Sequence, residues 1–498
     1  MLMASAVRAD VKLASLFGDG LVLQRDQPVR IWGSADAGEK VSVFFAGQTV
    51  TATAASDGGW CATLPGMLAA KVGRDLRVRG KNTIVVHNVL VGDVWICSGQ
   101  SNMEMEVSRS LDAAHETATA DFPAIRQIKI GRQLSERPLT TVPASAWQPA
   151  DPAHVGWFTA AGYYFARTMF RENGVPIGLI NCTWSGTPVE PWMSAEALGS
   201  DAAFQIVWDR WQADLAAYPE RQAIYEKKLA AWEIAERRAT LAGDKAREDF
   251  LKAQPRPRSP PTAPDYPYPG NPTQIYNGMV YPLRQAAIRG VLWYQGEANA
   301  VHAPEYAALF QACIQSWRTL FGRPDLPFYW VQIANYLVDT DWARLREAQT
   351  AALALPATGM AITIDIGDPL NIHPANKQEV GRRLALIAQA KLERQSVEFS
   401  GPMFAHADFV DGTARVNFTH GEGLNARCGP VMSLELAGED RMFHPAEGRI
   451  EGDTLVVSAA DVPRPVAVRY AWSASPHANL YNKAGLPASP FRSDTWPP

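Results

Sequence analysis

From about residue 93 to residue 395, apolar strand-like runs alternate with segments that have the apolar periodicity of helices. The strand-like runs cover residues 125–130, 177–182, 290–294, 328–333 and 360–364. The helical segments cover residues 163–172, 304–321, 342–353 and 374–392. Strands separated by helices favour an α/β fold with a parallel sheet covered on both faces, in which functional side chains follow the carboxyl ends of the strands.

Two β-rich regions flank this α/β pattern. Residues 11–92 contain short strand-like runs separated by Gly- and Asp-rich turns, and the last of these runs covers 82–87. This pattern predicts an N-terminal β module. Residues 396–498 return to strands and predict a C-terminal β module. The α/β domain is therefore expected to span 93–395. A helical and proline-rich insertion at about 200–272 interrupts it, either as an arm packed beside the domain or as a wall or lid of the substrate site.

Composition excludes several classes of protein. The 498 residues exceed one ordinary domain, and 47% hydrophobic with 20% charged residues indicates a well-cored globular chain. The net charge is −4 and no block of basic residues occurs, so the sequence has no basic surface with which to bind nucleic acid. No run of about 18 apolar residues predicts a membrane span. Residues 1–10 include the small-x-small pattern Val7-Arg8-Ala9, which predicts the remnant of a signal peptide and hence an exported protein.

A serine stands at the most favourable position of the α/β pattern. The apolar run 89–96 is typical of a buried strand, and residues 102–107 can start a helix. Ser101 lies on the glycine-containing turn between them. A serine on such a turn presents its hydroxyl beside the N–H groups of a helix N-terminus, which is the placement of a nucleophile.

A nucleophilic serine requires a base, and His373 has the best context among the nine histidines. It follows the strand-like run 360–364 through a loop and precedes Pro374, which suits the first turn of a helix. The loop places His373 at the same edge of the predicted sheet as Ser101. An imidazole titrating near neutral pH can serve there as general base.

An oxyanion hole is the third requirement, and two further strand ends offer donors for it. Gly186 follows the run 177–182 and can direct its N–H into the site, and Gln295 follows the run 290–294 and can donate from its side-chain amide. One such donor is typically worth about 10²–10³ in rate. Each of these candidate residues alone is a weak signal. Four of them, at four expected strand ends, together predict a serine hydrolase: Ser101, His373, Gly186 and Gln295.

Three motifs carry a resemblance to a known family. They are GQSNME at 99–104, WYQGE at 293–297 and GDPLNIHPANK at 367–377. The chain resembles the sialate O-acetylesterase-like carbohydrate esterases of the SGNH hydrolase superfamily, and the resemblance extends into both β-rich regions. It implies a three-layer α/β/α domain and hydrolysis of O-acetyl esters on sugars, with no metal or other cofactor.

The resemblance also assigns roles. It implies that Ser101 is the nucleophile, that His373 is the general base, and that the N–H groups of Ser101 and Gly186 hold the oxyanion together with Gln295 or Asn299.

Weaker assignments concern neighbouring side chains. Trp184, Trp293 and Tyr294 are candidates to line the acyl or sugar pocket, with core packing equally open for them. Asn102 is expected to stabilise the serine turn. Glu297 is expected either to support the site residues or to fix a loop as a hydrogen-bond acceptor.

The chain departs from the superfamily pattern at one position. SGNH enzymes commonly carry an aspartate three residues before the histidine, and this chain has Leu370 there. Three groups remain candidates to orient His373: Asp368, Asp365 and a backbone carbonyl near Leu370. With the last of these, the site is a Ser–His dyad.

The expected function is therefore that of an exported carbohydrate O-acetylesterase, acting on plant oligosaccharides such as those of xyloglucan or on sialic acids. Two alternatives remain open. One is a glycan-binding protein without catalysis, and the other is a lipase or thioesterase of the same superfamily.

Overall fold

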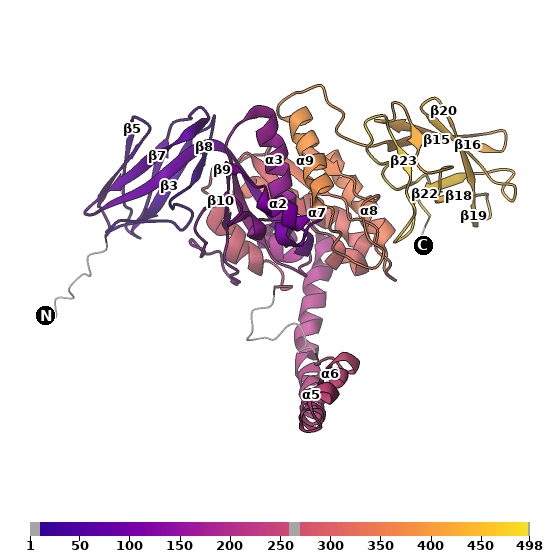
Figure 1. The fold of residues 1–498 in the computed structure, drawn as a ribbon, viewed down its shortest axis with the longest axis horizontal. Coiled ribbons are helices and arrows are strands. Elements are labelled where there is room, and N and C mark those ends of the chain that lie inside the picture. Colours follow the sequence, from indigo (N-terminus) through magenta and orange to yellow (C-terminus); the bar gives the residue numbers. More distant parts are fainter. Residues whose placement is uncertain (1–9, 258–268, 497–498) are drawn as a thin grey trace.

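A computed structural model of the chain describes residues 10–257 and 269–496. Residues 1–9 of the predicted signal remnant (1–10) and part of the proline-rich segment lie outside the described residues. Figure 1 shows a β-rich region at the N-terminal end, a central region of strands and helices, and a second β-rich region at the C-terminal end. The β-rich and mixed regions follow one another in the same order as the strand-like and helical patterns of the sequence.

The central sheet has the strand order β10-β9-β11-β8-β12-β13-β14. Its strands are β9 (Phe122–Lys129), β10 (Gln148–Ala150), β11 (Ile177–Thr183), β12 (Gly290–Tyr294), β13 (Phe328–Val331) and β14 (Thr358–Ala361) around β8 (Thr83–Gly99). β10 is antiparallel to β9, and the other neighbours in this order are parallel. The carboxyl ends of β11, β8 and β12 therefore meet at one edge, as the alternating pattern predicts.

β8 joins the N-terminal region to the central sheet as one strand. Its first half pairs antiparallel with β7 (Ala70–Arg79), and its second half lies parallel between β11 and β12. Asn88, with φ of +57°, lies between the two halves, where the pairing with β7 is irregular. The sequence predicts two separate strands here, at 82–87 and 89–96. In the structure, β8 continues through Asn88 without a turn.

Helices cover both faces of the central sheet. Leu292 and Trp293 are neighbours on β12, so their side chains enter different cores on opposite faces. Two helices pack on the Leu292 face, and two on the Trp293 face. The former are α3 (Ala160–Asn173) and α9 (Lys377–Lys391), and the latter are α7 (Ala303–Leu320) and α8 (Trp342–Ala351). Burial on both faces explains why the strands are almost wholly apolar.

The flanking regions consist mainly of antiparallel strands. The N-terminal strands are β1 (Lys12–Leu13), β2 (Val22–Gln24), β3 (Val29–Ser34), β4 (Lys40–Phe45), β5 (Gln48–Thr53) and β6 (Gly59–Leu64), together with β7 and the start of β8. The C-terminal strands form three sheets. One sheet contains β15 (Met403–Val410), β16 (Thr413–Thr419), β21 (Thr454–Ser458) and β20 (Glu447–Glu451), and a second contains β19 (Phe443–Pro445), β18 (Leu434–Ala437), β22 (Ala467–Tyr470) and β24 (Phe491–Arg492). The third pairs β17 (Asn425–Ala426) with β23 (Leu480–Tyr481).

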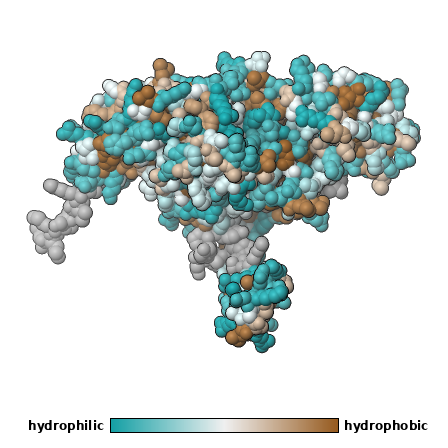
Figure 2. Space-filling model, in the orientation of Figure 1, coloured by the Kyte–Doolittle hydropathy of each residue, from teal (hydrophilic) through white to brown (hydrophobic). Residues whose placement is uncertain are grey.

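The insertion forms a helical arm that projects from the central region (Figure 1). It consists of α5 (Gln205–Leu241) and α6 (Asp244–Ala253), and Figure 2 shows mostly hydrophilic side chains on its distal part. The base of the arm is anchored, because Val207 is buried and the Arg210 guanidinium lies 2.9 Å from the Glu305 carboxylate. Within the described ranges, no helix combines the length and apolarity needed to cross a bilayer.

Candidate active site

The serine turn is fixed by backbone contacts between β8 and β12. β8 ends at Gly99, and the next N–H, that of Gln100, donates to the Tyr294 carbonyl at 3.0 Å. α1 (Ser101–Glu104) starts immediately afterwards. Gly99 has φ of +126°, and a Cβ there would lie 2.3 Å from the Tyr294 oxygen. Only glycine fits this close approach, which places the partly exposed Ser101 at the carboxyl edge of the sheet.

Two free N–H groups stand at this turn and in the loop after β11. Neither Ser101 N–H nor Gly186 N–H has an acceptor in the part of the chain that the structure describes. The Gly186 loop is held against the serine turn because Trp184 N–H donates to the Gly99 carbonyl at 3.1 Å, and Ser185 N–H donates to Glu104 Oε2 at 2.9 Å. Both N–H groups are thus available to an incoming oxyanion.

Gln295 does not point into this space. Its side chain is fully buried, and its amide donates to Asn299 Oδ1 at 2.7 Å and to the Thr187 carbonyl at 3.3 Å. Its amide oxygen accepts from the Tyr306 hydroxyl at 2.8 Å. The prediction that it donates to an oxyanion therefore needs correction. Its donors are already used, and one of them holds the Gly186 loop at the carbonyl of the next residue, Thr187.

Asn299 belongs to the same buried network. Its Oδ1 also accepts from Val189 N–H at 2.9 Å, and its Nδ2 donates to Glu190 Oε2 at 3.0 Å. Burial raises the pKa of the Glu190 carboxyl. The network fixes the backbone that follows Gly186, so Asn299 supports the loop rather than lining the space beside Ser101.

Two of the three predicted pocket aromatics are core residues. Trp293 and Tyr294 are each 0% exposed, on opposite faces of the sheet, so neither ring can contact a substrate outside the protein. The sequence could not separate pocket lining from packing at a strand end. Trp184 is partly exposed, with the Arg132 guanidinium 5.3 Å above its ring, and it remains a candidate to meet the substrate.

His373 lies in the loop between β14 and α9, partly buried. The Asn102 side chain ties this loop to the serine turn, because its Nδ2 donates to the Ile372 carbonyl at 2.9 Å. The same nitrogen donates to Glu297 Oε1 at 2.6 Å, and burial raises the pKa of that carboxyl. These contacts of Asn102 and Glu297 fit the supporting role predicted for them, and they join the loop that contains His373 to the serine turn.

No carboxylate in the described residues contacts the His373 ring. Asp368 is exposed, and its Oδ1 accepts from the N–H of Leu370 at 2.9 Å. The Asp365 side chain is 7% exposed and forms a bidentate ion pair with Arg383 at 2.6 and 2.8 Å. Both aspartates are thus occupied elsewhere.

Two side chains of the site were not singled out from the sequence. Glu104 anchors the Gly186 loop, and it carries an ion pair with Arg132 at 2.6 Å. Lys377 is buried, and its Nζ contacts both Asn102 of the serine turn and Pro374 of the histidine loop. Both residues stand inside the motifs that carry the family resemblance, which is the signal that could have found them.

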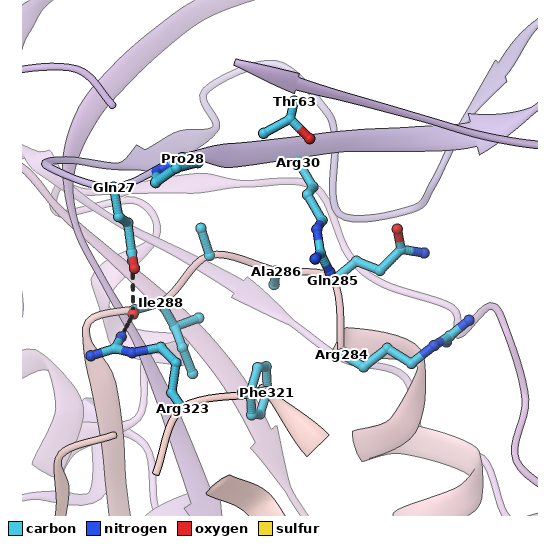
Figure 3. A pocket seen from close by; sticks show the side chains of 11 residues that line it. Gln27, Pro28, Arg30, Thr63, Arg284, Gln285, Ala286, Ile288, Phe321 and Arg323 are labelled. Atoms are coloured by element: carbon cyan, nitrogen blue, oxygen red, sulfur yellow. Dashed lines mark hydrogen bonds between the residues drawn. The ribbon is translucent and has the colours of Figure 1, made fainter. Parts of the chain in front are cut away.

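A cavity of about 250 Å³ lies elsewhere, between the N-terminal strands and the loop that leads into β12 (Figure 3). Gln27 and Arg323 both donate to the Ile288 carbonyl there, at 3.0 and 2.8 Å. Because Ile288 precedes β12, the cavity lies at the amino end of this strand and is separate from Ser101. Within the described ranges, no three His, Cys, Asp or Glu side chains gather as metal ligands would.

Comparison with known proteins identifies the family. Residues 91–225 and 266–390 match the family described as "Carbohydrate esterase, sialic acid-specific acetylesterase". The sialate O-acetylesterase of Rattus norvegicus is 28% identical, with 96% of this chain and 94% of that protein covered, and that of Homo sapiens is 27% identical, with 96% and 92% covered.

A solved structure gives the same result. The crystal structure of a carbohydrate acetylesterase from Xanthomonas citri matches with a TM-score of 0.82 and 38% identity, covering 98% of this chain and all of that one. These relatives show that the chain is a carboxylic-ester hydrolase. The chain belongs to the sialic acid-specific acetylesterase family of carbohydrate esterases, which confirms the family predicted from its motifs.

Proposed function

We propose that this protein is a carbohydrate O-acetylesterase that removes acetyl groups from glycans through a serine acyl-enzyme, with Ser101 as nucleophile and His373 as general base. The observation that carries the proposal is the hydrogen bond from the Asn102 side chain to the Ile372 carbonyl. Asn102 directly follows Ser101, and Ile372 directly precedes His373. The proposal is also supported by the N–H groups of Ser101 and Gly186, which have no acceptor among the described residues and can serve as the oxyanion donors that acyl transfer requires.

The proposed reaction has two halves. Ser101 Oγ attacks the acetyl carbonyl while His373 takes the hydroxyl proton, and the N–H groups of Ser101 and Gly186 stabilise the oxyanion. The ester C–O bond then breaks as His373 returns the proton to the sugar oxygen. In the second half, His373 takes a proton from water, which attacks the acyl-enzyme. The proton returns to Ser101 as acetate leaves.

We further propose an SGNH-type three-layer α/β/α domain at about 93–395 with the two β-rich regions as modules. The helices on both faces of a largely parallel sheet support the three layers. For the substrate we place plant-type acetylated oligosaccharides, xyloglucan fragments included, ahead of sialic acids. The 38% identical neighbour is a carbohydrate acetylesterase, whereas the matched mammalian sialate O-acetylesterases are 26–28% identical. Acetate release from acetylated xyloglucan and from O-acetylated sialosides compares the two classes directly.

Replacing Ser101 with alanine is expected to lower turnover of 4-nitrophenyl acetate by at least about 10³-fold, because the nucleophile is lost. The control is Ser56→Ala, at an exposed serine between β5 and β6 of the N-terminal region, which should keep full activity. Wild-type activity in Ser101→Ala would remove Ser101 from the chemistry. A wild-type chain that binds glycans but has no esterase activity would favour the binding-protein alternative.

Chain-length preference tests the second alternative. An acetylesterase is expected to hydrolyse 4-nitrophenyl acetate with at least about tenfold higher kcat/KM than the octanoate, because a pocket shaped for two carbons rejects a longer chain. A higher kcat/KM for the octanoate would instead indicate a lipase or thioesterase.

A further inference from the structure

Lys377 is a buried lysine at the first position of α9. Its side chain is 0% exposed, which is rare for a lysine unless its ammonium group is paired. Nζ donates to Asn102 Oδ1 at 2.7 Å and to the Pro374 carbonyl at 2.8 Å, and it lies 5.1 Å from the centre of the Tyr294 ring. The ammonium group is therefore held in one place by two hydrogen bonds and an aromatic face.

The two acceptors of Lys377 belong to the two halves of the proposed catalytic pair. Asn102 directly follows Ser101, and Pro374 directly follows His373. The Asn102 amide also donates to the carbonyl of Ile372, the residue before His373. The backbone on both sides of His373 is thus tied to the residue after Ser101, once directly and once through Lys377.

We propose that Lys377 is a positioning residue that fastens the histidine loop to the serine turn and places its positive charge at Pro374, the residue after His373. This inference rests on the proposed function, because it presupposes that Ser101 and His373 react. It also accounts for the missing aspartate of the superfamily pattern. The loop is held from beneath by Lys377 and Asn102 instead of by a carboxylate on the imidazole.

The charges around His373 agree with this role. Burial lowers the pKa of His373, and the positive charges of Lys377 on α9 and of Arg109, at the end of the 3₁₀ helix Val107–Arg109, lower it further. A triad carboxylate would have the opposite effect and raise the pKa. His373 therefore stays neutral to a lower pH than an ordinary histidine.

Lys377 carries its charge in the pH range where it is needed. Burial lowers the pKa of its ammonium group to about 7, against the pull of the Glu297 carboxylate and with a further lowering by Arg109. Glu297 reaches Lys377 through the Asn102 amide, which accepts from Nζ and donates to the carboxylate. Lys377 is thus mainly protonated below pH 7, where His373 gains its proton, so the like charge acts throughout that titration.

Two substitutions separate the hydrogen bonds of Lys377 from its charge. Lys377→Met removes both, and Lys377→Gln keeps a donor but removes the charge. We expect Lys377→Met to lower kcat for 4-nitrophenyl acetate by about 10–10²-fold, because the histidine loop loses a tether, and Lys377→Gln to lower it less. In both variants the acidic limb of kcat/KM is expected to move to higher pH, because the charge opposing His373 protonation is gone.

Lys391→Met is the matched control. Lys391 lies at the other end of α9 and also donates to a backbone carbonyl, that of Thr358, at 2.6 Å. This variant should leave both kcat and the acidic limb unchanged. A loss of activity in Lys377→Met and Lys377→Gln without movement of the acidic limb would reduce Lys377 to a structural residue and overturn the proposal.

The wild-type enzyme provides a test that does not depend on the folding of a variant. Its acidic limb is expected below the ordinary histidine pKa of about 6.5, and a limb above that value would overturn the inference. Failure of the proposed function has a different signature. In that case Ser101→Ala or His373→Ala would remain active, whereas failure of the inference alone leaves both inactive and the limb of Lys377→Gln in place.

Discussion

Replacing His373 with alanine is expected to lower kcat for 4-nitrophenyl acetate by about 10²–10⁴-fold, whereas replacing Asp368 with asparagine is expected to change it by less than about threefold. The first loss follows from removing the proposed base. The second substitution is mild because Asp368 Oδ1 accepts from Leu370 N–H, which an asparagine oxygen can also do. Steady-state kinetics from pH 4 to 9 measure both variants.

The opposite outcome for Asp368 would be equally clear. A carboxylate that holds the imidazole in the correct tautomer is worth about 10⁴ in a serine triad. A loss of that size in Asp368→Asn would mean that the loop rearranges to bring Asp368 onto the ring when substrate binds, and the dyad would have to be abandoned.

Asp365→Asn completes the comparison among the three candidates to orient His373. Asp365 and Arg383 are 7% and 4% exposed in their side chains, and removing one partner of a buried ion pair costs about 3–5 kcal/mol of stability. We expect this variant to unfold at a markedly lower temperature while the folded fraction keeps the wild-type pH profile. A shifted acidic limb in the folded protein would instead assign Asp365 to the imidazole.

The sequence predicted the backbone of the site better than its side chains. Ser101, His373 and Gly186 stand after strands whose apolar runs are distinct, and the parallel arrangement brings such strand ends to one edge. Gln295 stands after a strand as well, but its amide is used by Thr187 and Asn299. These partners are distant in sequence, so no local pattern could reveal them.

Because β12 is buried on both faces, its sequence lacks the alternation of polar and apolar residues that would show which side chains are exposed. In a half-exposed strand, polar and apolar residues alternate and show which side chains face the solvent. β12 is buried on both faces, so Trp293 and Tyr294 look alike in the sequence although they enter different cores. Lys377 was missed for the converse reason, because a charged residue at the start of a helix is normally exposed.

Gly99→Ala is expected to destabilise the fold by about 2–5 kcal/mol and to lower kcat by about 10²-fold. A Cβ at this position would lie 2.3 Å from the Tyr294 oxygen and 2.8 Å from its carbon, so β8 and β12 must move apart where the serine turn begins. This displacement reaches Ser101 two residues later. Chemical denaturation gives the loss of stability, and single-turnover kinetics on 4-nitrophenyl acetate give the loss of rate.

Gly429→Ala separates backbone strain from the clash. Gly429 has φ of +128°, nearly that of Gly99, but a Cβ there would meet nothing within 4 Å. Its substitution should cost about 1–2 kcal/mol and leave kcat unchanged, because only the cost of the unusual φ remains. If both variants lost the same stability and Gly99→Ala kept its rate, strain alone would explain Gly99. The close contact between β8 and β12 would then have no part in placing the serine.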